Sequence, residues 1–141
     1  MTQEEKELLF QDTSGRLPYG VKAYVKNWSK LDRKYYEGIY TVESIHPSLN
    51  TILVYSDKFS VEVIVGYDDY EIKPYLFPLS SMTKEQKEEY HNLCSVGTDE
   101  CGDIIYFNTY ESIDYLNKNK FDYRYLIPMG LAIDATNLNI Y

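Results

Sequence analysis

The stretch KPYLFPLSSMTKEQKEEYHNLC, residues 73–94, marks the point where the chain changes from strands to helices. Pro74 and Pro78 are excluded from a helix interior, and each keeps the residue before it in an extended conformation. An extended segment this apolar is expected to cross the core and to hold its neighbours in place. The side chains expected to be buried are Leu76, Phe77 and Leu79.

The spacing of capping residues predicts one helix within this stretch, one before it and one after it. Thr83 and Gln86 have the spacing of a capping box, in which each side chain accepts a hydrogen bond from a free backbone N–H, and this predicts a helix that ends near Leu93 or Cys94. Thr2 and Glu5 have the same spacing and predict a helix over residues 3–13. A third helix is expected to begin at Asn108 or Thr109.

Strands are predicted where apolar residues recur at every second position. The segments with this pattern, or with β-branched and aromatic runs between turns, are 21–26, 36–45, 51–55, 59–65, 70–72 and 104–107. Gly38 is expected to form a bulge or a sharp bend, and residues 121–127 are expected to form a helical turn. The fold class predicted is α+β, with a mainly antiparallel sheet of about five strands on which an N-terminal helix and two later helices pack.

Length and composition predict a single domain over residues 1–141, located in the cytoplasm. The longest apolar run covers only a few residues, so no membrane span is expected. The N-terminus MTQEEKELLF lacks the basic and apolar regions of a secretory signal. The two cysteines suit a reducing compartment and do not indicate a disulfide framework.

No motif predicts a catalytic centre, a metal site or a cofactor. The nearest approach to a metal site is His91, Cys94 and Cys101, but structural zinc usually uses cysteine pairs two to four residues apart, which this chain lacks. We therefore interpret Cys94 as a small buried apolar residue and His91 as a residue on the helix surface. The sequence contains no phosphate-binding loop, dinucleotide-binding motif or nucleophile elbow.

Basic and aromatic residues alternate between Lys22 and Tyr36, and such a pattern can follow a phosphate backbone and stack on bases. The opposing interpretation is a solvated strand face, because Asp32 and the net charge of −8 weaken the positive field. The candidate binding residues are Lys22, Tyr24, Lys26, Trp28, Lys30, Arg33, Lys34 and Tyr36.

Tyrosine is unusually frequent, with 16 residues against one tryptophan. A tyrosine ring is apolar and its hydroxyl is polar, so it suits half-buried sheet surfaces as well as protein interfaces. Strand propensity alone accounts for many of these rings, and we expect most of them to line the sheet and the rim of the core.

Three segments resemble small proteins encoded by Bacteroidales bacteria and by the phages or mobile elements of that group. They are RLPYGVK at 16–22, KPYLFPLSSMTKEQ at 73–86 and DYLNKNKFDYRYLIPMGLAID at 114–134. The resemblance does not extend over residues 23–70 and 95–112. It implies a bacterial or phage cytoplasmic setting and an accessory role, and it assigns no catalytic residue.

Three functions follow as hypotheses. The first is a non-enzymatic accessory protein that binds a partner protein through a tyrosine-rich sheet face, because aromatic rings are good interface anchors. The alternative is a nucleic-acid-binding protein that uses residues 22–36. The third is an enzyme whose acidic and tyrosine side chains converge only in the folded chain.

Overall fold

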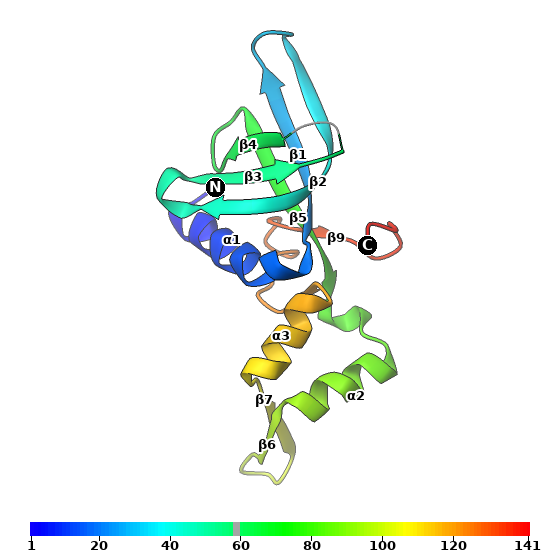
Figure 1. Cartoon of the computed structure of the whole chain (residues 1–141). Helices are drawn as coiled ribbons and strands as arrows, with labels where there is room; N and C mark the ends of the chain where they lie inside the picture. The colour runs from blue at the N-terminus through cyan, green and yellow to red at the C-terminus, as the bar shows by residue number, and fades with distance from the viewer. Residues whose placement is uncertain (58–59) are drawn as a thin grey trace.

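The computed structural model describes residues 1–57 and 60–141. Helix α1 (Gln3–Arg16) lies across the sheet, whereas α2 (Lys84–Leu93) and α3 (Tyr110–Lys118) lie at the opposite end of the molecule from the β1–β2 hairpin (Figure 1). Short 3-10 turns cover Leu17–Tyr19, Pro47–Leu49 and Leu79–Ser81. No helix in the described ranges is both long and apolar enough to span a bilayer.

The strands form one large sheet and one separate ribbon. The large sheet contains β1 (Lys22–Ser29), β2 (Lys34–His46), β3 (Thr51–Tyr55), β4 (Ser60–Ile64), β5 (Tyr70–Pro78), β8 (Phe121–Asp122) and β9 (Ile133–Asp134). The ribbon contains β6 (Ser95–Thr98) and β7 (Ile104–Phe107). The first residue of the predicted strand 59–65, Phe59, lies outside the described residues.

The strand order confirms the predicted fold class. The order is β4-β3-β2-β1-β5-β8, with β9 also paired to β5. All pairs from β4 to β5 are antiparallel, and only the two short strands β8 and β9 lie parallel to β5. The sheet therefore has seven strands where about five were predicted. The two-residue strand β8 is too short to give a sequence pattern, whereas β9 falls within residues 131–134, for which the sequence predicts a short strand or an extended tail.

The core lies between α1 and the sheet. Ala23 and Val25 on β1 point to the same side as Val42 on β2, and Leu9 and Phe10 of α1 pack in the same cluster of buried residues. These positions alternate along the strands, so one face of the sheet is buried and the other is left to solvent. A second, smaller cluster joins the end of β5 to the C-terminal segment through Leu76, Leu126, Leu131 and Ala132.

A fully buried ion pair connects α1 to the C-terminal half of the chain. Arg16 donates from Nε to Asp12 at 2.8 Å, and neither side chain is exposed to solvent. The same guanidinium donates to the carbonyl oxygen of Phe121 at 2.7 Å and to that of Leu116 at 3.4 Å. Arg124 approaches Asp12 at 3.8 Å. One guanidinium thus ties the end of α1 to α3 and β8.

The stretch 73–94 has the predicted extended course, but of the three side chains expected to be buried only Leu76 is. Pro74 and Leu76 are buried in β5, while Phe77 and Leu79 are half-buried. Thr83 and Gln86 form the predicted capping box at the start of α2. Capping boxes also begin α1 at Thr2 and α3 at Thr109.

Several details differ from the predictions. Helix α1 continues to Arg16, and Gly15 is part of the helix instead of ending it. A Cβ atom added at Gly15 would lie 3.3 Å from the side-chain nitrogen of Asn117. The irregularity in β2 falls between Val42 and Ser44 rather than at Gly38. Residues 121–122 form β8, and Asp122 then accepts hydrogen bonds from the backbone of Leu126 and Ile127 in place of the expected helical turn. Helix α2 has no buried residue and packs on α3 rather than on the sheet.

Candidate functional site

The predicted basic and aromatic residues lie on the β1–β2 hairpin, but on two different faces. In the antiparallel register Lys26 is opposite Glu37 and Trp28 is opposite Tyr35, and residues at alternate positions share a face. Four of the eight candidates therefore project from the outer face of the sheet: Lys22, Tyr24, Lys26 and Trp28.

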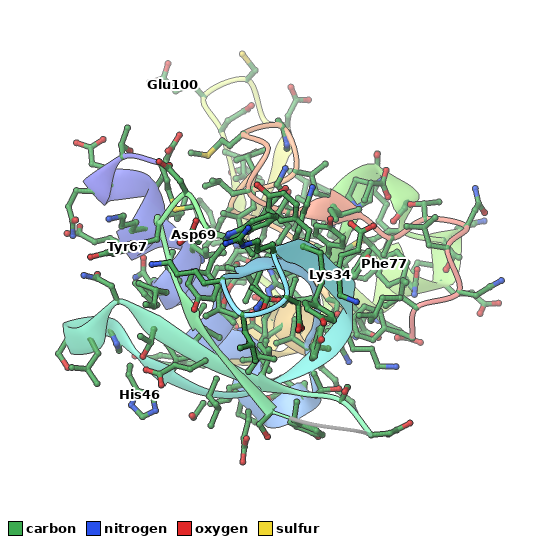
Figure 2. The ribbon with its side chains drawn as sticks, turned by 90° about the horizontal axis from the view of Figure 1, so that it is seen from above. Lys34, His46, Tyr67, Asp69, Phe77 and Glu100 are labelled. Atoms are coloured by element: carbon green, nitrogen blue, oxygen red, sulfur yellow. The ribbon has the colours of Figure 1, made fainter. Side chains whose placement is uncertain are left out.

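The other four candidates lie at the tip or on the opposite face. Lys30 and Arg33 lie in the turn, where Arg33 has φ 53°. Lys34 and Tyr36 begin β2 on the side opposite to Trp28, and Lys34 lies 4.8 Å from the Tyr36 ring centroid. Viewed from above, the hairpin is seen end-on with Lys34 near its tip (Figure 2). The eight residues thus do not form one flat surface.

Acidic groups balance the cations on the outer face. Lys26 lies between Glu37 on β2 and Glu71 on β5 in the strand registers, and its Nζ is 4.5 Å from the Tyr35 ring centroid. Tyr24 donates to Glu37 at 2.6 Å, and this hydrogen bond is the first cause that raises the pKa of Tyr24 to about 12. The face is therefore aromatic and close to neutral.

A second surface is formed by residues 84–110, which we call the arm. It consists of α2, the ribbon β6–β7 and the turn into α3, and it extends away from the sheet at the end opposite the β1–β2 tip (Figure 1). The turn between β6 and β7 is held by Asp99, whose side chain accepts from the backbone N–H groups of Cys101 and Asp103, both at 2.9 Å. Glu100 in this turn lies at the periphery of the molecule (Figure 2).

The ribbon exposes apolar side chains on both faces. In its register Val96 pairs with Tyr106 and Thr98 with Ile104 on one face, whereas Phe107 lies on the other. A Cβ on Gly97 would come within 2.9 Å of the Phe107 ring, so the absence of a side chain there lets the ring lie across β6. Within the arm, the large apolar side chains with more than half of their surface exposed are Val96 (64%), Ile104 (63%), Phe107 (53%) and, just beyond β7, Tyr110 (91%).

Aromatic stacking and hydrogen bonds hold the ribbon on α2 and α3. His91 of α2 stacks on Tyr106 of β7 with ring centroids 3.7 Å apart and planes 4° apart. Tyr90 donates to Asn108 at 2.5 Å, and Thr109 donates to the carbonyl oxygen of Leu93 at 2.6 Å. An isolated two-stranded ribbon is only marginally stable, so these contacts account for its order.

Tyrosine hydroxyls in the arm and elsewhere resist ionisation. Burial first, and then a hydrogen bond with Cys94, raise the pKa of Tyr90 to about 12, whereas its bond to Asn108 acts in the opposite direction. Burial first, and then the hydrogen bond to Glu89, raise the pKa of Tyr115 to about 12, and burial does the same for Tyr141. In Tyr115 the hydroxyl donates to Glu89 at 3.1 Å, which further disfavours a phenolate.

These shifts predict loss of structure in alkali. A folded-state pKa above the unfolded value of about 10 means that the protonated tyrosines stabilise the fold fully below pH 10, and this contribution is lost as the pH rises toward 12. We expect tyrosinate absorbance and far-UV circular dichroism to change together between those values. Tyrosines that all ionise near pH 10 while the dichroism stays unchanged would contradict the assignment.

The three residues closest to a metal-site pattern all lie in the arm. Cys94 is half-buried, Cys101 is exposed, and the ring of His91 is stacked on Tyr106. Within residues 1–57 and 60–141 no group of three or more His, Cys, Asp or Glu side chains could hold a metal ion. Cys94 is thus less buried than predicted, and His91 is half-buried against Tyr106 instead of lying free on the helix surface.

A pocket of about 410 Å³ lies at the root of the arm. Its walls come from the end of β5, the end of α3 and the C-terminal segment, and they include Phe77, Lys118 and Lys120. Phe77 lies on the side of the molecule where α2 and the C-terminal segment are found (Figure 2). The described residues that line this pocket include two lysines and Tyr141 but no acid. The hypothesis of an enzyme with converging acids and tyrosines stays a prediction.

Sequence reasoning identified neither the arm nor this pocket. The signal for the ribbon was present in Ile104–Phe107, which was correctly predicted as a strand. Its partner β6 is not predicted, because residues 95–102 contain two glycines and two acids and read as a loop. Comparison with protein-family models, with curated proteins and with solved structures found no match for this chain.

Proposed function

We propose that the chain is a non-enzymatic accessory protein of a bacterium or its phage that binds a partner protein through the arm. The observation that carries the proposal is the exposure of Val96, Ile104, Phe107 and Tyr110 on an element outside the core. Val96 and Ile104 share one face of the ribbon and Phe107 lies on the other, so both faces carry exposed apolar surface of the kind that marks interaction sites in soluble proteins. Aromatic residues among them are frequent anchors of binding energy.

The charge of the arm indicates what kind of partner fits. Between residues 84 and 110 there are six acidic residues and only two lysines, Lys84 and Lys87. None of the ion pairs in the described part of the chain involves any of these residues. A second copy would bring the same negative charge, so we assign the surface to a partner with basic residues around apolar ones.

The ribbon also offers a mode of binding. Within the described residues β6 and β7 pair only with each other, so each strand has a free edge of backbone N–H and C=O groups. An extended segment of the partner can add to such an edge, with backbone hydrogen bonds giving affinity and alternate side chains giving specificity. An open hollow of about 520 Å³ beside Tyr110 can receive one of those side chains.

Synthetic peptides test the proposal. A peptide of about ten residues that alternates Val, Ile or Tyr with Lys and Arg reproduces the expected strand chemistry. Its matched control carries Glu at every basic position. We expect the basic peptide to bind in fluorescence anisotropy, to weaken as salt is added, and to exceed its acidic counterpart by at least about tenfold in affinity. Equal affinity for the two peptides, or no binding of either, would refute the charge assignment.

The β1–β2 hairpin supports nucleic-acid binding as a second candidate function. The observation in favour is that Lys30, Arg33 and Lys34 lie together at its tip, where no ion pair of the described residues neutralises them. Against it, Lys26 is flanked by Glu37 and Glu71.

This candidate makes a distinct prediction. Single-stranded DNA should bind at low salt, and Lys30→Ala with Arg33→Ala should reduce the affinity several-fold. The salt dependence should also become flatter, because each phosphate that a basic side chain neutralises releases about 0.7 counterions from a single strand. The control is Lys84→Ala with Lys87→Ala in the arm, which should change nothing. Absence of DNA binding at low salt, or an equal effect of both pairs in a gel-shift assay, would exclude the hairpin.

A further inference from the structure

The pocket at the root of the arm has an aromatic wall. Phe77 contacts Phe121 with ring centroids 6.4 Å apart and Tyr141 with centroids 6.0 Å apart. Tyr141 is held in position by its hydroxyl, which donates to the carbonyl oxygen of Tyr75 at 2.8 Å and accepts from the backbone N–H of Lys22 at 2.9 Å. These rings form a fixed apolar surface on one side of the pocket.

The other side of the pocket is cationic. Its lining includes Lys118 and Lys120 together with amide and hydroxyl groups such as Asn137, and no Asp or Glu of the described residues lines it. Lys120 Nζ lies 4.9 Å from the Tyr141 ring centroid, and Lys22 Nζ lies 6.0 Å from it. In a chain with 22 acidic and 14 basic residues, a pocket lined by two lysines and no carboxylate is an exception.

Hydrogen bonds within the protein use only some of the donors of these lysine ammonium groups. Lys120 donates to the carbonyl oxygen of Lys118 at 2.9 Å, which satisfies one carbonyl at the end of α3. An ammonium group has three donors, so this bond uses one of them. None of the ion pairs between described residues involves Lys22, Lys118 or Lys120.

The surroundings of Lys120 disfavour its positive charge, and a bound anion would stabilise it. Burial, and then the positive charges of Arg16, Lys118 and Lys22, lower the pKa of the Lys120 ammonium. An anion placed among these cations would offset their mutual repulsion. The volume of about 410 Å³ also falls in the range of about 300–1,000 Å³ that is typical of small-molecule sites.

We infer that this pocket binds a small anion that carries a planar ring, such as a nucleoside monophosphate. The ring lies against Phe77 and Tyr141, and the anionic group accepts hydrogen bonds from Lys118 and Lys120. The inference is independent of the proposed protein partner, because it rests on residues outside the exposed ribbon.

Calorimetric titration with four probes tests the site: AMP, 4-hydroxybenzoate, adenosine and inorganic phosphate. We expect at least one of the two planar anions to bind with Kd below about 1 mM, and adenosine and phosphate to bind at least about tenfold more weakly. Phosphate binding as tightly as the planar anions would overturn the role of the aromatic wall. Failure of both planar anions to bind would overturn the site itself.

Substitutions then locate the bound anion. Lys118→Gln and Lys120→Gln should each weaken it by about tenfold or more, since each removes a charge-assisted hydrogen bond. Lys87→Gln on α2, outside the pocket lining, should leave the affinity unchanged. Lys118 is exposed, so its variant is expected to fold even if the Lys120 variant does not. Unchanged affinity in Lys118→Gln and in any folded Lys120→Gln protein would overturn the assignment.

Discussion

Replacing Arg16 by Met should lower the free energy of unfolding by about 3–5 kcal/mol, because removal of one partner leaves the other charge buried. Asp12 is completely buried, and its carboxylate accepts two hydrogen bonds from the Arg16 guanidinium. The same guanidinium also donates to two backbone carbonyl groups. Globular domains are stable by only about 5–15 kcal/mol, so the loss is a large part of the total. Urea denaturation followed by circular dichroism measures it.

Two further variants distinguish loss of the Asp12–Arg16 ion pair from loss of side-chain packing. Arg124→Met removes a half-buried cation at 3.8 Å from Asp12, and we expect it to cost less than about 1 kcal/mol. A double variant, Asp12→Leu with Arg16→Met, removes both charges and should recover part of the stability that Arg16→Met alone removes. If Arg124→Met destabilises the protein as much as Arg16→Met, the ion pair is not what ties α1 to the C-terminal half.

The second large effect is expected in the arm. Ile104→Asp combined with Phe107→Asp should lower the affinity for the basic peptide by about 100-fold or more, because anchor side chains at the centre of an interface often contribute about 2 kcal/mol each. Both side chains are more than half exposed, so little folding energy depends on them. The thermal midpoint should therefore move by only a few degrees while binding is abolished.

A matched control lies at the other end of the molecule. Leu31 in the β1–β2 turn is 93% exposed, and Leu31→Asp adds the same kind of charge to the same kind of site. We expect this variant to bind the basic peptide like the unmodified chain. Equal losses of affinity in Leu31→Asp and in the arm variant would show that binding follows net charge and not the ribbon.

The sequence was informative where local rules decide the structure. Capping pairs at Thr2 and Thr83 were visible as spacings, and both form as predicted, since a cap depends only on residues within one turn. The prolines at 74 and 78 likewise imposed the extended course of β5. Alternation along β1 predicts a strand with one buried face, and the β-branched and aromatic run between turns predicts β3.

The buried ion pair, the exposed ribbon and the pocket depend on distant contacts, which spacing does not reveal. Asp12 and Arg16 were not singled out, because a charged pair four residues apart is ordinarily a solvated helix pair and its burial here depends on Phe121 and Leu116. Apolar residues in β7 read like those of any core strand, and only the fold shows that they are exposed. The aromatic wall of the pocket joins residues more than sixty positions apart, Phe77 and Tyr141.

The most direct test of the arm as the binding surface is an NMR titration of the isotope-labelled chain with the basic peptide. Our account predicts that backbone amide shifts concentrate in residues 95–110, with slowed hydrogen exchange along one edge of the β6–β7 ribbon. Shifts confined to the β1–β2 hairpin, or the absence of any shift in the ribbon at saturating peptide, would contradict it.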